Sequence, residues 1–106
     1  MSLIQIQWTS ASIEEARKIV ADLLMKKWIA CAQLLPQLES HFIWKGELTT
    51  ASEVLVILKT RQERFTEIKS YIESNCSYEV PEILQIRCDD CNKAYLDWVF
   101  ETTKLV

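Results

Sequence analysis

Two groups of residues in this chain combine side-chain types with a spacing that could support chemistry. The first is Cys88-Asp89-Asp90-Cys91, which has the C-x₂-C spacing of zinc sites and redox dithiols. Thiolates prefer Cu(I) and Zn(II), so Cys88 and Cys91 form a candidate soft-metal pair, with Cys76 or the two aspartates as further ligands. The sequence contains no second such pair and no histidine cluster. Three interpretations therefore stay open: an incidental pair in a structural loop, a soft-metal site, or a redox dithiol.

The second group is Tyr78-Glu79-Val80-Pro81-Glu82-Ile83, which joins a predicted helix to a predicted apolar strand. Segments that connect elements hold functional residues more often than cores do. Proline cannot donate a hydrogen bond to a β-ladder, so Pro81 should mark the first residue or the edge of the strand. Tyr78 and Glu79 are then expected just outside the sheet.

A wider set of residues is predicted to meet at a subunit boundary: Trp44, Lys59, Tyr78, Glu79 and Glu82. One interpretation is that they form hydrogen bonds and ion pairs across an interface. We favour it because tyrosine is enriched at interfaces where its ring is buried and its hydroxyl is paired. The other interpretation is an inter-subunit cleft that binds a ligand. No Ser-His-Asp arrangement is visible, so we predict that the protein is not an enzyme and requires no cofactor.

The remaining thiols and the single histidine suggest less chemistry. Cys31 lies between two alanines in an apolar segment, where a thiol behaves as a small hydrophobic side chain, so we expect it in the core. Cys76 is expected at the C-terminal end of a helix, away from the positive N-terminus that activates a thiol. His41 is expected on an outward face, and no second histidine is present to share a metal or a proton.

Hydrophobic periodicity predicts the elements that position these residues. Ile4, Ile6 and Trp8 alternate with glutamines, which indicates a half-buried first strand. Residues 12–15 and 60–63 have the pattern of capping boxes, which begin helices. The first helix is predicted over about residues 13–27, with a buried stripe at Ile13, Ala16, Val20, Leu23 and Leu24. Residues 28–58 are predicted to form a bent hairpin that is interrupted at Pro36 and turns at Lys45-Gly46. A second helix follows and buries Phe65, Ile68 and Ile72, and the last strand contains Ile83, Leu84 and Ile86. Asn92 or Asp90 is expected to cap a third helix, which has Tyr95, Trp98 and Val99 on one face. The predicted order is βαββαβ with an extra C-terminal helix.

The segment Val54-Leu55-Val56-Ile57-Leu58 is apolar without alternation, so both of its faces should be covered. A four-stranded sheet with two helices covers only one face. Since monomers rarely expose large apolar patches, we predict a homo-oligomer whose sheets or hairpins pack together. Trp8, Trp28 and Trp98 are interpreted as core or interface residues.

Length and composition limit the class of protein. A chain of 106 residues fits a single domain. The net charge is −3 and no block of basic residues is present, so nucleic acid and anionic membranes are poor partners. The N-terminal residues lack a signal-peptide pattern, and no apolar run approaches the roughly 20 residues of a membrane span. We therefore expect a cytoplasmic protein whose four cysteines are thiols.

Five segments in the same order resemble the CutA divalent-cation tolerance family, and they extend over nearly the whole chain. They are Ala30-Cys31-Ala32 with Pro36, Trp44-Lys45-Gly46-Glu47-Leu48, Glu53-Val54 with Lys59-Thr60, the Tyr78 to Ile83 segment, and Tyr95-Leu96-Asp97-Trp98. The resemblance implies an α+β, ferredoxin-like protomer over residues 1–106, assembled as a homotrimer similar to PII signalling proteins. It also implies a role in tolerance of copper and other divalent metals. A signalling module that binds a small ligand in inter-subunit clefts is the alternative.

The chain departs from the family pattern at several positions. Family members usually have His and then Pro where this chain has Cys76 and Ser77, and copper-binding members have a Cys where it has Trp8. The family copper site therefore does not carry over residue by residue. Cys76, in the place of the histidine, is the best single candidate for a metal ligand. Gln33 replaces the usual Asn, and the hairpin tip reads Lys-Gly-Glu instead of Glu-Gly-Lys.

Overall fold

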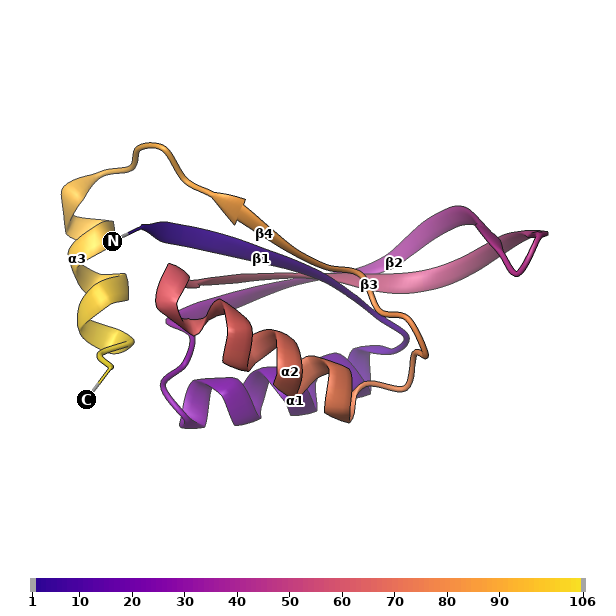
Figure 1. Ribbon diagram of the computed structural model, residues 1–106, viewed down its shortest axis with the longest axis horizontal. Coiled ribbons are helices and arrows are strands. Elements are labelled where there is room, and N and C mark those ends of the chain that lie inside the picture. Colours follow the sequence, from indigo (N-terminus) through magenta and orange to yellow (C-terminus); the bar gives the residue numbers. More distant parts are fainter. Residues whose placement is uncertain (1, 106) are drawn as a thin grey trace.

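The computed structural model describes residues 2–105 (Figure 1). Met1, which precedes the predicted first strand, and Val106, the end of the predicted domain, lie outside the described residues. The elements in chain order are β1 (Leu3–Ser10), α1 (Ile13–Met25), β2 (Cys31–Trp44), β3 (Glu47–Arg61), the 3₁₀-helix η1 (Gln62–Arg64), α2 (Phe65–Asn75), β4 (Ile83–Arg87) and α3 (Lys93–Thr102). This confirms the predicted βαββαβ order with an additional C-terminal helix.

The four strands form one antiparallel sheet in the order β2-β3-β1-β4. Helices α1 and α2 lie side by side on one face of the sheet, and α3 lies near one end (Figure 1). Ile4, Ile6 and Trp8 of β1 are fully buried against the two helices, as their alternation predicts. Val56 and Leu58 of β3 point to the same side and are also fully buried. The main core therefore lies between the sheet and α1 and α2.

Strands β2 and β3 extend beyond the rest of the sheet as a long hairpin, which accounts for the 44 Å long axis of the molecule (Figure 1). The predicted interruption at Pro36 is a shift in register between Leu35 and Leu38. The predicted turn at Lys45-Gly46 is also confirmed, and both residues have positive φ, 51° and 81°. Such a two-residue turn matches the twist of the flanking strands and favours glycine.

Only one of the two predicted capping boxes begins a helix. Ser12 Oγ accepts the backbone N–H of Glu15 at 3.1 Å and starts α1. Thr60 instead belongs to β3, and its hydroxyl donates to the carbonyl of Trp28 at 2.5 Å. The prediction of a second box is therefore wrong, because the hydroxyl that would cap a helix is used to tie β3 to the start of the hairpin. Helix α2 begins without a side-chain cap.

Helix α1 ends at Met25, and Lys27 beyond it has a φ of 60°. Leu24 is 41% exposed, so its predicted burial is wrong, while Ile19 takes part in the buried stripe. No helix within residues 2–105 combines the length and apolar character needed to span a membrane.

The second face of the sheet is only partly covered. Leu55 and Ile57 of β3 point away from α1 and α2 and are half-buried, and Leu84 and Ile86 of β4 are 47% and 40% exposed. The register aligns Ile57 with Gln7 and Gln7 with Leu84, so these side chains form one row across the sheet. Trp98 of α3 is 46% exposed, so it is not a core residue of the protomer.

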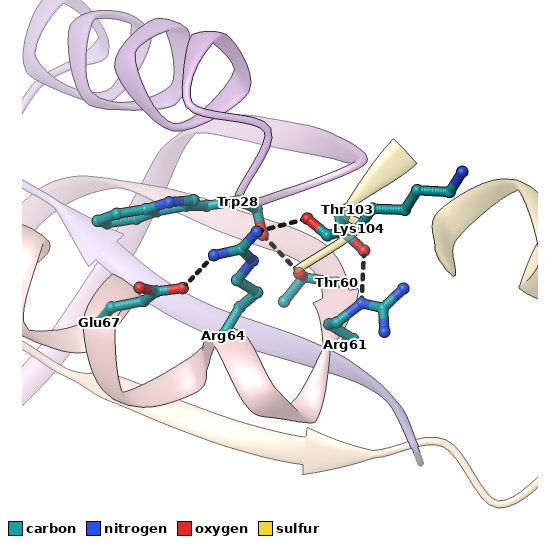
Figure 2. A network of polar contacts seen from close by, with 7 residues as sticks. All are labelled: Trp28, Thr60, Arg61, Arg64, Glu67, Thr103 and Lys104. Atoms are coloured by element: carbon teal, nitrogen blue, oxygen red, sulfur yellow. Dashed lines mark hydrogen bonds and ion pairs between the residues drawn. The ribbon is translucent and has the colours of Figure 1, made fainter. Parts of the chain in front are cut away.

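Helix α3 is held by polar contacts at its C-terminal end (Figure 2). The buried Arg61 donates from Nε to Thr103 Oγ1 at 3.1 Å and from Nη2 to the carbonyl of Phe100. Its guanidinium also lies 4.6 Å from the centre of the Phe100 ring. Arg64 donates to the carbonyl of Lys104 at 2.7 Å. Arg61 at the end of β3 and Arg64 of η1 thus fix the position of α3.

Candidate functional site

A cavity of about 710 Å³ lies between the hairpin and the segment that joins α2 to β4. The hairpin contributes Phe42, Trp44 and Glu53, and the joining segment contributes Tyr78, Glu79 and Glu82. The chain reaches this arrangement because the hairpin extends past the end of the sheet where α2 ends. Aromatic rings and carboxylates line the same space, which is the composition of a small-ligand site.

Tyr78 connects the two sides of the cavity wall through a short hydrogen bond. Its hydroxyl donates to Glu53 Oε2 at 2.6 Å, and the Glu53 side chain belongs to a buried residue of β3. Burial and, second, the hydrogen bond to Glu53 raise the pKa of Tyr78 to about 12. The pair ties the joining segment to the middle of the hairpin and keeps the phenol neutral to a higher pH than in a free tyrosine.

The other two carboxylates of the joining segment are also anchored. Glu82 Oε2 accepts hydrogen bonds from Gln7 Nε2 and Thr9 Oγ1 of β1, each at 3.2 Å. Glu79 forms an exposed ion pair with Lys45 of the hairpin turn, at 3.6 Å. The cavity is thus closed on two sides by contacts that involve its acidic residues.

The structure brings four of the five predicted cleft residues together and separates the fifth. Trp44, Tyr78, Glu79 and Glu82 all line the cavity. Lys59 does not, because its ammonium group donates to Gln33 Oε1 on the second face of the sheet, near the start of β2. Glu53 also lines the cavity and is not among the predicted residues, although a carboxylate at the start of an apolar run is a usable signal.

Cys76, the candidate metal ligand, occupies the C-cap position of α2 and packs against the main core. Its Sγ donates to the carbonyl of Tyr78 at 3.6 Å. Burial is the main cause that raises the pKa of this thiol, and the charges of Glu15 and Glu73 act in the same direction. A metal ligand must be a thiolate, so this environment opposes metal binding by Cys76 in the conformation described here.

Cys88 and Cys91 lie in the loop between β4 and α3, and both are free thiols that are half-buried. They pack with Tyr95 against a small apolar cluster beneath α3, whereas Cys76 packs against the main core. Within residues 2–105 no three His, Cys, Asp or Glu side chains are grouped closely enough to hold a metal ion. The described part of the chain therefore offers no third ligand for this pair.

His41 is exposed on the hairpin and lines the cavity. Its Nε2 lies at hydrogen-bond distance from Glu39 Oε2, 2.6 Å, and Thr50 Oγ1 lies 3.4 Å from its Nδ1. Both ring nitrogens are therefore in contact with neighbouring hairpin residues.

Comparison with known proteins gives a consistent result. The family model described as CutA1 divalent ion tolerance protein matches residues 4–102. The divalent-cation tolerance protein CutA of Pyrococcus horikoshii is 38% identical over 102 residues, which cover 96% of this chain and 99% of that protein. The solved structure of the periplasmic divalent cation tolerance protein CutA of Archaeoglobus fulgidus aligns with a TM-score of 0.93 and 37% identity, covering 96% of this chain and 99% of that one. The structure of CutA1 from Oryza sativa aligns with a TM-score of 0.95 and 26% identity, covering 100% and 97%.

Proposed function

The chain belongs to the CutA1 divalent ion tolerance protein family, and from this premise we propose that it acts in the response to divalent metal ions as a ligand-binding homotrimer and not as an enzyme. The observation that carries the proposal is the apolar second face of the sheet beside an acidic, aromatic cleft. In a single copy the apolar face stays partly exposed, and the cleft does not group three metal ligands within residues 2–105.

The apolar face supports self-association. The elements within residues 2–105 leave an apolar surface partly exposed, which is formed by Leu55, Ile57, Leu84 and Ile86. Monomers rarely leave such surfaces in water. At the hairpin tip, Leu48 is 85% exposed, which fits a hairpin that packs against another copy. Three copies related by rotation would cover three such faces in a closed assembly, similar to the PII-like arrangement that the resemblance implies.

The cleft is the proposed ligand site. Glu53, Glu79 and Glu82 supply carboxylate oxygens, which bind divalent cations, and His41 adds an imidazole. Because no three such ligands are grouped within residues 2–105, we propose that a neighbouring copy completes the set at the subunit boundary. Copper or another divalent metal ion is the proposed ligand.

A PII-like site for a small organic ligand is the second candidate. The specific observation in its favour is that Phe42, Trp44 and Tyr78 line the same cavity, whose volume is in the range of small-molecule sites. Such a ligand would raise the melting temperature of the protein in the absence of any metal ion.

Copper titration by calorimetry tests the proposal, after light scattering has established the number of copies in the assembly. The wild type is compared with Glu82→Gln, Cys76→Ser and the exposed control Glu63→Gln, under reducing and non-reducing conditions. We expect stoichiometric binding that Glu82→Gln weakens and the control does not. Loss of binding only in Cys76→Ser would place the metal at that thiol. Absent binding in the wild type would refute the metal proposal and favour the small-ligand alternative.

We also propose the cytoplasm as the compartment, because all four cysteines are unpaired thiols. The Archaeoglobus relative is described as periplasmic, so the compartment needs a direct measurement. Cell fractionation with marker proteins for each compartment makes that measurement, and recovery of the protein outside the cytoplasmic fraction would refute this part of the proposal.

A further inference from the structure

Three of the four cysteines meet at the end of the sheet that α3 covers. Cys31, the first residue of β2, places its Sγ 3.3 Å from the hydroxyl of Tyr95. Cys88 and Cys91 pack with the same tyrosine against the small cluster of Leu3, Ala30 and Val99. All three thiols are half-buried, so small solutes can reach them. Cys31 is therefore not the inert core residue that the sequence predicted.

The environment of Tyr95 supports this proximity. Burial raises the pKa of Tyr95, the contact with Cys31 raises it further, and negative charge on Cys88 or Cys91 would also act on the phenol. The two loop thiols thus lie within electrostatic range of one hydroxyl, together with the thiol of β2.

The loop thiols are attached differently from Cys31. The Cys88 N–H donates to the carbonyl of Leu3 at 3.1 Å, which is the last tie between this loop and β1. The Cys91 N–H donates to the neighbouring Asp90 Oδ1 at 2.9 Å. No strand or helix includes Cys88, Cys91 or the two residues between them. The backbone between the two sulfur atoms can therefore adjust without breaking the sheet or α3.

Cys91 also precedes Asn92, the N-cap residue of α3, whose side chain makes no capping hydrogen bond. The positive end of the helix favours a negatively charged group at this position. Cys76 has the opposite setting, because it follows the C-terminal end of α2. Cys76 can therefore serve as an internal control for the reactivity of Cys91.

We propose that Cys88 and Cys91 form a redox-active dithiol that a hydroperoxide oxidises to an intramolecular disulfide. In the first step, the thiolate of one cysteine attacks a peroxide oxygen, so that an S–O bond forms and the O–O bond breaks. With hydrogen peroxide, the hydroxide that leaves takes up a proton and becomes water. In the second step, the other thiolate attacks the sulfenic sulfur, so that the S–S bond forms and the S–O bond breaks. The hydroxide that leaves takes up a proton and becomes a second water. Two electrons pass from the thiols to the peroxide.

The disulfide would join the end of β4 to the start of α3, because Cys88 follows the one and Cys91 precedes the other. Cys31 takes no part in the bond, since its sulfur is held by Tyr95 in the sheet. Oxidation would restrict the loop and hold the N-terminal end of α3 more firmly against the apolar cluster.

Peptide mass spectrometry tests the proposal directly on the wild-type protein. Trypsin cleaves after Arg87 and Lys93, so Cys88 and Cys91 leave in one peptide, residues 88–93, while Cys31 and Cys76 leave in separate peptides. The reduced protein is exposed to increasing hydrogen peroxide, alkylated and digested. We expect the 88–93 peptide without alkyl groups and lacking two hydrogens, at peroxide concentrations that leave Cys76 fully alkylated.

The proposal is overturned if Cys88 and Cys91 are still alkylated when Cys76 has reacted, or if the bond forms between Cys31 and a loop cysteine instead. The Cys88→Ser variant is expected to stop at the sulfenic acid of Cys91, the thiol next to the positive end of α3, whereas Cys76→Ser is expected to oxidise like the wild type. Hydrogen exchange adds a readout on structure: the first turn of α3 should exchange more slowly after oxidation in the wild type and at an unchanged rate in Cys88→Ser.

Discussion

Removal of the Tyr78 hydroxyl should destabilise the protein by about 1.5–2 kcal/mol. The Tyr78→Phe variant keeps the ring that lines the cavity and removes only the donor that Glu53 accepts at 2.6 Å. A hydrogen bond to a charged group contributes about 1.5–3 kcal/mol, and the lower part of this range applies because solvent screens a phenol that is only partly buried. The Glu53 carboxylate, which belongs to a buried residue, would then lose its donor.

The same contact predicts how stability depends on pH. Because the pKa of Tyr78 is about 12 in the folded protein and about 10 when unfolded, folding favours the neutral phenol. The contribution of this group is therefore complete below about pH 10 and is lost as the pH rises through 12. Tyr78→Phe should lack this loss of stability at alkaline pH.

Urea unfolding at one fixed protein concentration measures both effects, since dissociation of an oligomer would otherwise shift the midpoint. A double-mutant cycle with Glu53→Gln isolates the pair. Coupling below about 0.5 kcal/mol, or an alkaline transition that Tyr78→Phe leaves unchanged, would refute the assignment of this pair as the main tie between the hairpin and the joining segment.

Three further predictions concern the hairpin, α3 and the open face. Arg61→Ala should destabilise the protein by about 2–4 kcal/mol, because charged hydrogen bonds to α3 are lost. Hydrogen exchange should become faster in α3 than in α1, and an equal increase of the exchange rate in both helices would contradict this. Gly46→Ala should cost about 1 kcal/mol in thermal unfolding, because φ is +81° while no atom lies within 4 Å of the added Cβ; a larger cost would point to a contact at the tip. Ile57→Asp should reduce the mass found by light scattering to that of one chain, whereas Ala21→Asp on the exposed side of α1 should not; an unchanged mass for Ile57→Asp would contradict packing through this face.

The parts of the fold that the sequence predicted are those in which local pattern and long-range packing agree. The alternation of Ile4, Ile6 and Trp8 reports one buried face, and all three are fully buried. The prediction of a second capping box was wrong because the Thr60 hydroxyl could form either of two hydrogen bonds. The pattern of neighbours favours a helix cap, but the carbonyl of Trp28, which is far away in the sequence, lies within reach and takes the hydrogen bond.

Lys59 shows why strand ends are hard to assign from sequence. Lys59 directly follows the apolar run of residues 54–58, and Glu53 directly precedes it. Strand β3 is continuous over 15 residues, so the six steps from Glu53 to Lys59 span about 20 Å along the sheet. Glu53 reaches the cavity and Lys59 does not. Only the length and register of the strand decide which end a residue occupies.

The replacement at Cys76-Ser77 has a structural consequence for the site beside it. The Ser77 N–H donates to Glu15 Oε1 at 3.0 Å, and the Cys76 thiol is turned towards the core and the carbonyl of Tyr78. A proline at position 77 could not donate this bond, so the bond depends on the departure from the family pattern. The bond fixes the start of the joining segment to α1, and Tyr78 fixes its next residue to β3. A metal ion could recruit Cys76 only by turning the thiol away from the core and removing its proton. The segment that joins α2 to β4 therefore lines the cleft and also holds Cys76 away from the cleft. For this reason we place the ligand at the carboxylates.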